Sequence, residues 1–440
     1  MSLSTQPYKG ARDFYPEDKR IQKYEFAVLR SVAERYGYEE YDAPILEPLE
    51  IFLAKTGEEI VNEQTYTFTD RGGRQVVIRP EMTPTVSRMV AARRQQLSYP
   101  LRWYSIPNLW RYERPQRGRL REHWQLNVDL FGVTTTDAEF EIISLIDDVF
   151  KRFKATPEMY EIRINHRGLI DFVLKDYLGL DETERHDVSK LIDRMHKLPD
   201  GAFLTELDAL ISDQRKAEQV PEKLLSFLSS KSIKDIHETL AATPSAAELK
   251  ELIDKLTQSG ISNVRFDPTV MRGFDYYTGI VFEVFDTHPD NNRSMLGGGR
   301  YDGLVGLFGV EPVATVGFGW GDVTLTNFLE LHSLLPPLPS ETRIFVVPIG
   351  EDTAKRIDGL VRELRNRGLN IACGDYRKKL GDQIKTADKK GIPFVLIVGE
   401  NELREQRYVL RELATRNEQQ LDINAIESTV KAWAEVHAGN

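Results

Sequence analysis

The sequence has almost no cysteine and no long apolar run. Its 440 residues include one cysteine, Cys373, which excludes an intramolecular disulfide and a cysteine-rich metal site. No stretch is long and apolar enough to span a bilayer, and the first residues lack the apolar core of a signal peptide. A lone thiol suits a reducing compartment, so we predict a soluble, cytoplasmic protein that binds no membrane.

An excess of positive charge is also missing. Lys and Arg number 58 against 68 Asp and Glu, which gives a formal net charge of −10. A polyanion such as RNA must therefore bind to local basic patches and not to the whole surface. The length is enough for two or three domains with substantial cores.

What the chain does have is an arginine-rich turn between two strand-like segments, within residues 101–132. The first segment is apolar and ends near Trp110, and the turn contains Pro115 and Gly118. The return segment alternates, so opposite faces of a strand carry two sets of side chains: Trp124, Leu126, Val128 and Leu130 on one, Gln125, Asn127 and Asp129 on the other. We predict a long β-hairpin with a basic tip.

The tip concentrates positive charge. Five arginines lie within a short span: Arg111, Arg114, Arg117, Arg119 and Arg121. So many like charges need an anionic partner, and the guanidinium fork matches phosphate oxygens. With the polar strand face continuing from the turn, the hairpin predicts a floor with phosphate-binding groups at one end and hydrogen-bonding groups at the other.

Two other segments carry candidate ligands. Glu81 and Thr83 lie between a strand at residues 74–79 and a helix that follows. They can hold an ammonium group, or they can cap the helix and supply its first-turn acid. Glycines at 297–299 allow close backbone approach, either to another strand or to a ligand. For Glu81 and Thr83 the residues alone favour the cap, and for the glycines they leave the question open.

The rest of the chain predicts further domains. Residues 166–255 read as helices with polar joints, which indicates a helical insertion. Residues 332–341 contain prolines and read as a linker. Residues 342–440 alternate strands and helices, which predicts a small α/β domain with a mostly parallel or mixed sheet. Its local basic residues are typical of a solvated face, but in an acidic chain they favour RNA: Arg377, Lys378, Lys379, Lys385, Lys389 and Lys390.

Three motifs resemble the signatures of histidyl-tRNA synthetases, which are class II aminoacyl-tRNA ligases: Arg111-Tyr-Glu-Arg-Pro-Gln, Arg272-Gly-Phe-Asp-Tyr-Tyr and Gly298-Gly-Arg-Tyr-Asp-Gly-Leu. The resemblance implies an α+β fold with a six-stranded antiparallel sheet flanked by helices. It implies a catalytic domain at 1–165 and 256–331, the insertion at 166–255 and an anticodon-binding domain at 342–440. A homodimer would form through the first long helix and the strand around Pro44.

The implied activity is that of a histidine–tRNA ligase. L-histidine reacts with ATP, bound with Mg²⁺, to give histidyl-adenylate and pyrophosphate, and histidine then moves to the terminal ribose of tRNA(His). The resemblance implies no metal site formed by the protein itself.

The resemblance also assigns roles to residues. Arg272 and Arg111 would be catalytic. Histidine would contact Glu81, Thr83, Arg111, Gln125, Asp129, Tyr276, Tyr277 and Tyr301. ATP would contact Arg111, Glu113, Arg119 and His123, and the tRNA acceptor end would contact Arg114 and Gln116.

The sequence departs from the family pattern at three positions. The segment Asp322-Val323-Thr324 lacks the usual third-motif arginine, His123 replaces an adenine-stacking phenylalanine, and Asp129 is shorter than the common glutamate. The missing arginine favours an alternative, a non-catalytic histidine-sensing paralogue such as the regulatory subunit of ATP phosphoribosyltransferase. Arg272, the arginine hairpin and the C-terminal domain favour the ligase.

Overall fold

The computed structural model describes residues 3–53, 64–195, 198–199, 201–271, 276–291 and 293–438. The chain divides into two compact units, residues 1–15 with 22–335, and residues 336–440 with 16–21. The predicted catalytic Arg272 lies outside the described residues.

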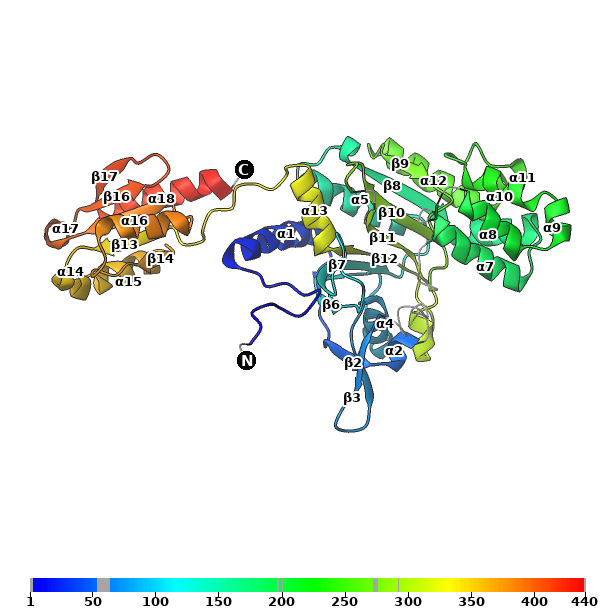
Figure 1. Ribbon diagram of the computed structural model, residues 1–440, viewed down its shortest axis with the longest axis horizontal. Helices are drawn as coiled ribbons and strands as arrows, with labels where there is room; N and C mark the ends of the chain where they lie inside the picture. Colours follow the sequence, from blue (N-terminus) through cyan, green and yellow to red (C-terminus); the bar gives the residue numbers. More distant parts are fainter. Residues whose placement is uncertain are drawn as a thin grey trace. The chain divides into compact units, whose positions relative to one another are not determined.

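The first unit is built on a nine-stranded sheet (Figure 1). Its centre is a run of six antiparallel strands, in the order β5 (Leu101–Ser105), β7 (Glu122–Phe131), β12 (Thr315–Gly321), β11 (Ser294–Arg300), β10 (Ile280–Asp286) and β8 (Tyr160–His166). Two parallel strands extend this run, β1 (Glu39–Glu40) beside β5 and β9 (Val264–Phe266) beside β8, while β6 (Asn108–Trp110) pairs with β7. The predicted fold class and the hairpin at 101–132 are confirmed.

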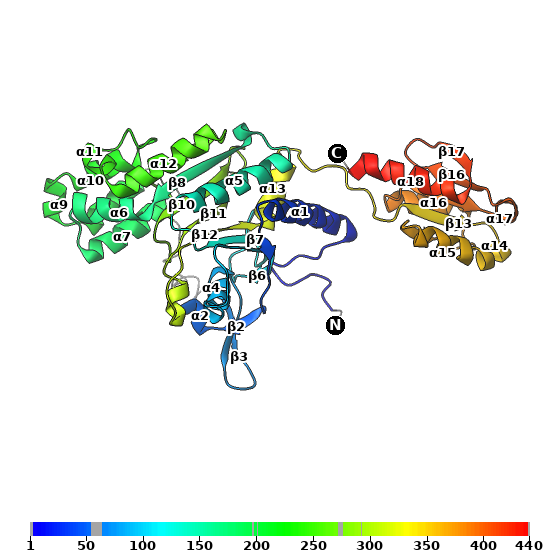
Figure 2. The same ribbon diagram turned by 180° about the vertical axis from the view of Figure 1, so that it is seen from behind.

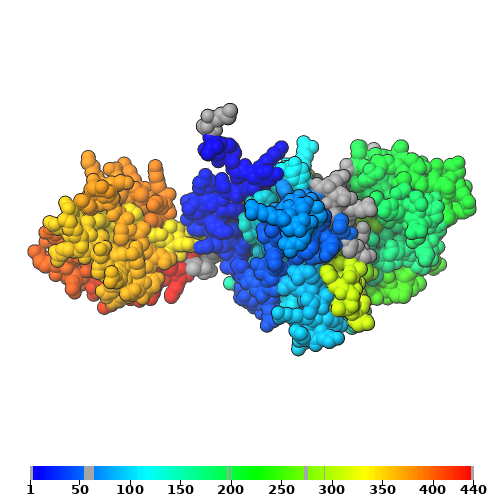
Figure 3. Space-filling model, turned by 90° about the horizontal axis from the view of Figure 1, so that it is seen from below, coloured from blue at the N-terminus to red at the C-terminus, as the bar shows by residue number. Residues whose placement is uncertain are grey.

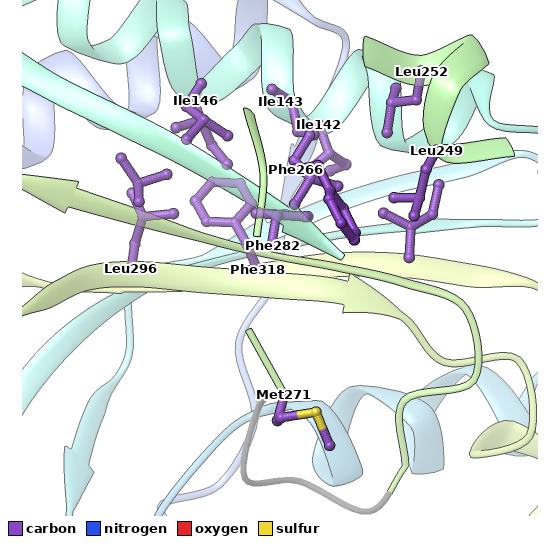
Figure 4. Packing of buried hydrophobic residues seen from close by; sticks show 14 of the residues in the cluster. Ile142, Ile143, Ile146, Leu249, Leu252, Phe266, Met271, Phe282, Leu296 and Phe318 are labelled. Atoms are coloured by element: carbon purple, nitrogen blue, oxygen red, sulfur yellow. The ribbon is translucent and has the colours of Figure 1, made fainter. Parts of the chain in front are cut away.

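One face of this sheet is covered by four helices, α1 (Pro16–Arg35), α5 (Asp137–Arg152), α12 (Pro244–Gln258) and α13 (Asp322–Leu331). Leu126, Val128 and Leu130 of β7 are buried among them, as the alternation predicts. Figure 4 shows Ile142 and Ile146 of α5 and Leu249 of α12 pointing into this layer. Figure 2 shows α5 and α12 over the same sheet from behind.

The opposite face carries α4 (Thr83–Ala92), which packs on Leu101 and Phe131, and the short 3-10 helix Val305–Phe308. Beside it lies a three-stranded sheet of β2 (Leu46–Pro48), β4 (Gln75–Ile78) and β3 (Tyr66–Thr69), with α2 (Glu50–Leu53). The hairpin predicted around Gly72 and Gly73 is the β3–β4 pair.

Residues 38–46 predict a strand interrupted at Pro44, and the interruption is confirmed. The two short strands on either side of it join different sheets, β1 beside β5 and β2 beside β4. Pro44 lies between them, and because proline has no N–H it cannot continue a ladder.

Residues 166–258 are mainly helical and form the green surface in Figure 3. After η1 (Pro157–Met159) and β8 come α6 (Arg167–Phe172), a π-helical turn (Val173–Tyr177), α7 (Glu182–Asp193), α8 (Ala202–Leu210), α9 (Asp213–Ala217), α10 (Val220–Leu228) and α11 (Glu238–Ala241). Asp181 and Glu184 form a capping box at the start of α7, which satisfies the first free N–H groups of the helix.

The second unit has a five-stranded mixed sheet, in the order β14 (Ile371–Cys373), β13 (Ile344–Pro348), β15 (Phe394–Val398), β16 (Tyr408–Glu412) and β17 (Glu418–Leu421). The first three strands are parallel to one another. β16 runs antiparallel to β15, and β17 runs antiparallel to β16. Its helices are α14 (Glu351–Arg356), α15 (Asp358–Asn366), α16 (Leu380–Lys389), α17 (Glu400–Glu405) and α18 (Ile423–Ala438). The spacing of apolar residues predicts a single helix over residues 353–367, but the structure has two helices there, α14 and α15.

Candidate active site

A cavity of about 240 Å³ lies on the face of the large sheet opposite to helices α1, α5, α12 and α13. Its lining brings together most residues predicted for histidine and ATP, although they come from distant segments: Glu81, Thr83, Arg111, Glu113, Arg119, His123, Gln125, Tyr276, Tyr277 and Tyr301. Asp129 does not line the cavity itself, but it is hydrogen-bonded to Tyr301, which does.

Strand β7 supplies the floor of the cavity. Gln125 and Asn127 line it, while Leu126 between them points into the core. The side-chain amide of Asn127 donates to the backbone oxygen of Gln125 at 3.0 Å. The alternation of the sequence predicts that Asn127 lies on this polar face, but it does not indicate a role for this residue.

The neighbouring strand β12 is adapted to this floor by glycine. Gly317 pairs with Asp129 and Gly319 with Asn127. A Cβ atom on Gly319 would lie closer than 3.0 Å to the Gln125 amide, and one on Gly317 would lie as close to the Asp129 carboxylate. These side chains can therefore lie across β12 only because it carries glycine. Sequence reasoning missed this role, although glycine at every second position of the strand was its signal.

Asp129 is buried beside the cavity, with 3% of its surface exposed. The Tyr301 hydroxyl donates to its Oδ1, and Oδ2 is buried without a hydrogen-bond partner among the described residues. Burial raises the pKa of Asp129 to about 7, and the Tyr301 hydrogen bond opposes that rise. A buried carboxylate oxygen of this kind needs a donor, so the site fits a ligand that offers an N–H group.

Three tyrosine rings form a wall beside Asp129. Ring centroids of Tyr276 and Tyr277 lie 4.8 Å apart, and those of Tyr276 and Tyr301 5.5 Å apart. The Tyr276 hydroxyl donates to Glu81 Oε2 at 3.1 Å. This wall suits a flat ligand with polar edges.

Glu81 and Thr83 lie at the start of α4. The N-cap position belongs to Met82, and no side chain makes a capping hydrogen bond there. Glu81 is 3% exposed and lines the cavity with Thr83. The capping interpretation is therefore wrong, and both residues line the cavity.

The arginine hairpin brings two guanidinium groups to the cavity. Arg111 is fixed there because its Nε donates to the Pro80 oxygen at 2.8 Å, and Arg119 lies 4.0 Å from Glu113. Arg121 instead stacks on Tyr112, 3.9 Å from the ring centroid. Only part of the arginine cluster thus faces the first cavity.

Arg114 and Gln116 line a second cavity of about 240 Å³, together with Gln64 and Tyr112. Glu113 and Arg119 line both cavities. The residues predicted for the tRNA acceptor end are therefore separate from the main cavity but adjacent to it.

His123 faces the main cavity as a neutral ring. Burial and the positive charge of Arg111 lower its pKa to about 3. A neutral imidazole beside a guanidinium can stack on a nucleotide base without adding charge.

The first turn of α13 lines the cavity at the position where the third-motif arginine is missing. The Thr324 hydroxyl donates to backbone oxygens of Met295, at 2.7 Å, and Gly321, at 2.9 Å. Asp322 is buried and paired with Arg12 at 2.7 Å. Further lining residues that the sequence did not assign are Glu283, Ser294, Met295 and Gly297.

Within the described part of the chain, no group of three His, Cys, Asp or Glu side chains is arranged to hold a metal ion. The described helices include none with the length and apolar character of a membrane span.

Known proteins resemble this chain along nearly its whole length. The family model for histidyl-tRNA synthetase matches residues 10–320, and the model for the anticodon binding domain matches residues 343–433. The histidine–tRNA ligase of Leptospira biflexa is 45% identical over 423 residues, covering 94% of this chain and 95% of that protein. The histidine–tRNA ligase of Thermoplasma volcanium is 36% identical over 407 residues, covering 92% and 94%.

Solved structures share the fold. The histidyl-tRNA synthetase of Nostoc sp. PCC 7120 has a TM-score of 0.82 at 23% identity and covers 98% of this chain and 100% of that one. A Bacillus halodurans protein described as ATP phosphoribosyltransferase regulatory subunit/histidyl-tRNA synthetase has a TM-score of 0.73 at 24% identity, covering 91% and 99%.

Proposed function

The chain belongs to the histidyl-tRNA synthetase family, and we propose how its residues carry out that family's reaction. As a histidine–tRNA ligase it is an enzyme that joins L-histidine to tRNA. The observation that carries the assignment of the site is the buried, unpartnered Oδ2 of Asp129, whose other oxygen is hydrogen-bonded to Tyr301 of the cavity wall. Such an oxygen can accept a hydrogen bond from an imidazole N–H. The arginines of the cavity can bind a phosphate next to that imidazole.

Histidine would lie with its imidazole between Asp129 and Tyr277. An imidazole has two nitrogens, so an acid on one side and a phenol on the other reject side chains that lack either partner. Its α-ammonium would be held by Glu81, Thr83 and Gln125, all of which line the cavity. Tyr276 and Tyr301 would enclose the ring.

ATP would lie along the arginine side of the cavity. Arg111 would contact the α-phosphate and the histidine carboxylate, Arg119 the outer phosphates and Glu113 the adenine, with the neutral His123 ring against the base. Mg²⁺ would be held chiefly by phosphate oxygens and waters, because the described residues offer no three-ligand cluster. Glu283, whose carboxylate lines the cavity, fits as a protein ligand, and the ion would neutralise phosphate charge.

Chemistry would proceed in two steps. A carboxylate oxygen of histidine attacks the α-phosphorus and pyrophosphate leaves. Arg111 and Arg272 would stabilise the charge that builds on the α-phosphate, which is often the largest catalytic contribution. The terminal ribose hydroxyl of tRNA(His), positioned near Arg114 and Gln116, then attacks the histidyl carbonyl carbon and AMP leaves.

We assign residues 1–165 and 256–331 to the catalytic domain, 166–255 to an insertion, 332–341 to a linker and 342–440 to anticodon binding. A cytoplasmic homodimer fits this assignment. Ile45 and Leu46, which follow Pro44 in the segment proposed for the dimer contact, are each 45% exposed, and apolar side chains exposed in this way suit a subunit contact.

The test is histidine-dependent exchange of labelled pyrophosphate into ATP. The ligase exchanges, whereas a histidine-sensing regulator does not. Arg272→Ala is expected to lose most of the exchange rate, on the order of 10²-fold or more, while equilibrium binding of histidine is largely kept. An equal loss of binding and rate would mean that the arginine only builds the pocket, and absence of exchange in the unmodified protein would overturn the ligase assignment.

A further inference from the structure

Three buried polar atoms behind the histidine pocket lack a hydrogen bond of normal geometry within the described part of the chain. They are the Tyr41 hydroxyl, the Ser105 hydroxyl and Asp129 Oδ2. Buried polar groups almost always have a partner, and an unsatisfied one is costly. Their common position therefore needs an explanation.

Strand register puts the three residues on one face of the sheet. Trp103 of β5 pairs with Asp129 of β7, and Ser105 pairs with Asn127. Tyr41 continues β1 along β5, because its N–H donates to the Tyr104 oxygen at 2.8 Å. Its ring centroid lies 5.7 Å from that of Trp103. Tyr41 therefore faces the same side as Asp129.

The three groups also influence one another. Burial raises the pKa of Asp129, and the hydroxyls of Tyr301 and Tyr41 both lower it. Burial and the Asp129 charge raise the pKa of Tyr41, while Ser105 lowers it. The three buried atoms share one face of the sheet and none has a partner among the described residues. A hydrogen bond from Tyr41 to Asp129 would satisfy two of them at once.

We propose that Tyr41 is a positioning residue for histidine: its hydroxyl holds the Asp129 carboxylate on the side away from Tyr301, so that a carboxylate oxygen faces the imidazole. A carboxylate oxygen can accept two hydrogen bonds, so Oδ2 can serve Tyr41 and the ligand together. This inference rests on the proposed histidine pocket and deepens it.

The short side chain of Asp129 makes such a support necessary. An aspartate reaches one methylene less far than a glutamate, so its oxygens must be aimed accurately to meet a ring in the cavity. Tyr301 holds Oδ1 from one side, and Gly317 leaves no side chain to press on the carboxylate from β12. Tyr41 lies on the same face of the sheet, beside the Trp103 that pairs with Asp129, and is placed to support the carboxylate from β1.

Other charged and titratable groups around this cluster are Tyr38, Arg79, Asp42 and Tyr276. Arg79 donates to the Ala43 oxygen at 2.6 Å and to Asp42 at 3.3 Å. Tyr276 is hydrogen-bonded to Glu81, and the Tyr38 hydroxyl donates to Glu141 at 3.0 Å. Each has a partner of its own. Tyr301 is therefore the observed donor to Asp129, and Tyr41 is the proposed second donor.

The test is Tyr41→Phe in the full-length enzyme, which keeps the ring against Trp103 and removes only the hydroxyl. We expect the KM for histidine in pyrophosphate exchange to rise on the order of tenfold, with the KM for ATP unchanged. Because the Tyr41 hydroxyl lowers the pKa of Asp129, its loss should also move the midpoint of the histidine KM against pH upward. The titration of free histidine is common to both proteins and cancels in the comparison.

Tyr38→Phe is the matched control, because it removes a buried hydroxyl from the same segment but one bonded to Glu141. It should leave the histidine KM and its pH midpoint unchanged. If Tyr41→Phe matches this control while the unmodified enzyme exchanges pyrophosphate, the inference is wrong and the proposed function stands. No exchange in any protein would instead overturn the proposed function.

A double-mutant cycle gives a second readout. Asp129→Glu should weaken histidine binding by crowding Tyr41, and Asp129→Glu combined with Tyr41→Leu should recover part of it, because removing the phenol makes room. Coupled residues give non-additive changes. Strictly additive losses would show that the two side chains do not cooperate.

Discussion

At the residue scale, the proposed histidine-binding role requires Asp129 to stay buried and still carry charge. Its pKa is raised to about 7 in the folded protein by burial, against about 3.9 in an unfolded chain. The folded state therefore binds a proton that the unfolded state has released between these values. The stability that Asp129 contributes is greatest at low pH and is lost as pH rises toward 7.

Asp129→Asn cannot ionise, so the variant should escape this loss. Its free energy of unfolding should exceed that of the wild type at pH 8 by roughly 1 to 3 kcal/mol, with a smaller difference at pH 5.5. Urea unfolding at the two pH values measures this. The same variant should lose histidine-dependent exchange, because an amide cannot replace a carboxylate beside the imidazole. A stability difference that is the same at both pH values would contradict the pKa argument.

Some of the site could be predicted from single residues and some could not. The alternation of β7 indicated Gln125 and Asp129, and the arginine cluster indicated Arg111. Tyr41 carried no such signal, because its relation to Asp129 arises from the register of β1 on β5 and of β5 on β7. Pairing between distant strands is not encoded in any local pattern.

At the scale of elements, β7 and β12 form the floor together. Gly319→Ala would place a Cβ closer than 3.0 Å to the Gln125 amide, so Gln125 must leave its position. We expect the histidine KM to rise on the order of tenfold, with a loss of about 1–3 kcal/mol in stability from overpacking. Gly303→Ala is the control, since a Cβ there meets nothing within 4 Å. Equal kinetics of the two variants would contradict this role of β12.

Elements with a strong pattern were predicted well, and those whose boundaries depend on tertiary contacts were not. The sequence predicts strands at residues 280–286 and 394–398 and a helix at residues 322–331. These bounds coincide with those of β10, β15 and α13. The β16–β17 hairpin was missed, because β17 is an almost fully exposed strand with no apolar alternation. The break between α14 and α15 was missed because the helical spacing of apolar residues continues across it.

At the scale of the whole molecule, the two units have different chemistry. The first contains the cavity with its carboxylates, tyrosines and arginines. The second matches an anticodon binding domain and carries lysines on the exposed face of α16, while Gln383 and Ala387 point inward. Because the chain as a whole is acidic, RNA is expected to bind to a local basic face such as this one and not to the surface in general.

Lys385→Glu with Lys389→Glu tests this division. The two side chains are exposed and lie four residues apart, so they share one face of α16. Reversing their charge should raise the KM for tRNA in aminoacylation, roughly tenfold or more, and reduce the dependence of log affinity on log salt by about 0.7–0.9 per lost phosphate contact. Pyrophosphate exchange, which needs only histidine and ATP, should be unchanged.

Lys355→Glu is the matched control. Lys355 belongs to the same unit but lies on α14, where it pairs with Glu351 at 2.8 Å. It should leave tRNA affinity nearly unchanged, because its charge is already balanced and lies outside the α16 face. If the control weakens tRNA as much as the α16 pair, the effect is one of net charge. If the α16 pair changes neither the KM for tRNA nor the salt dependence, RNA binds elsewhere on the second unit.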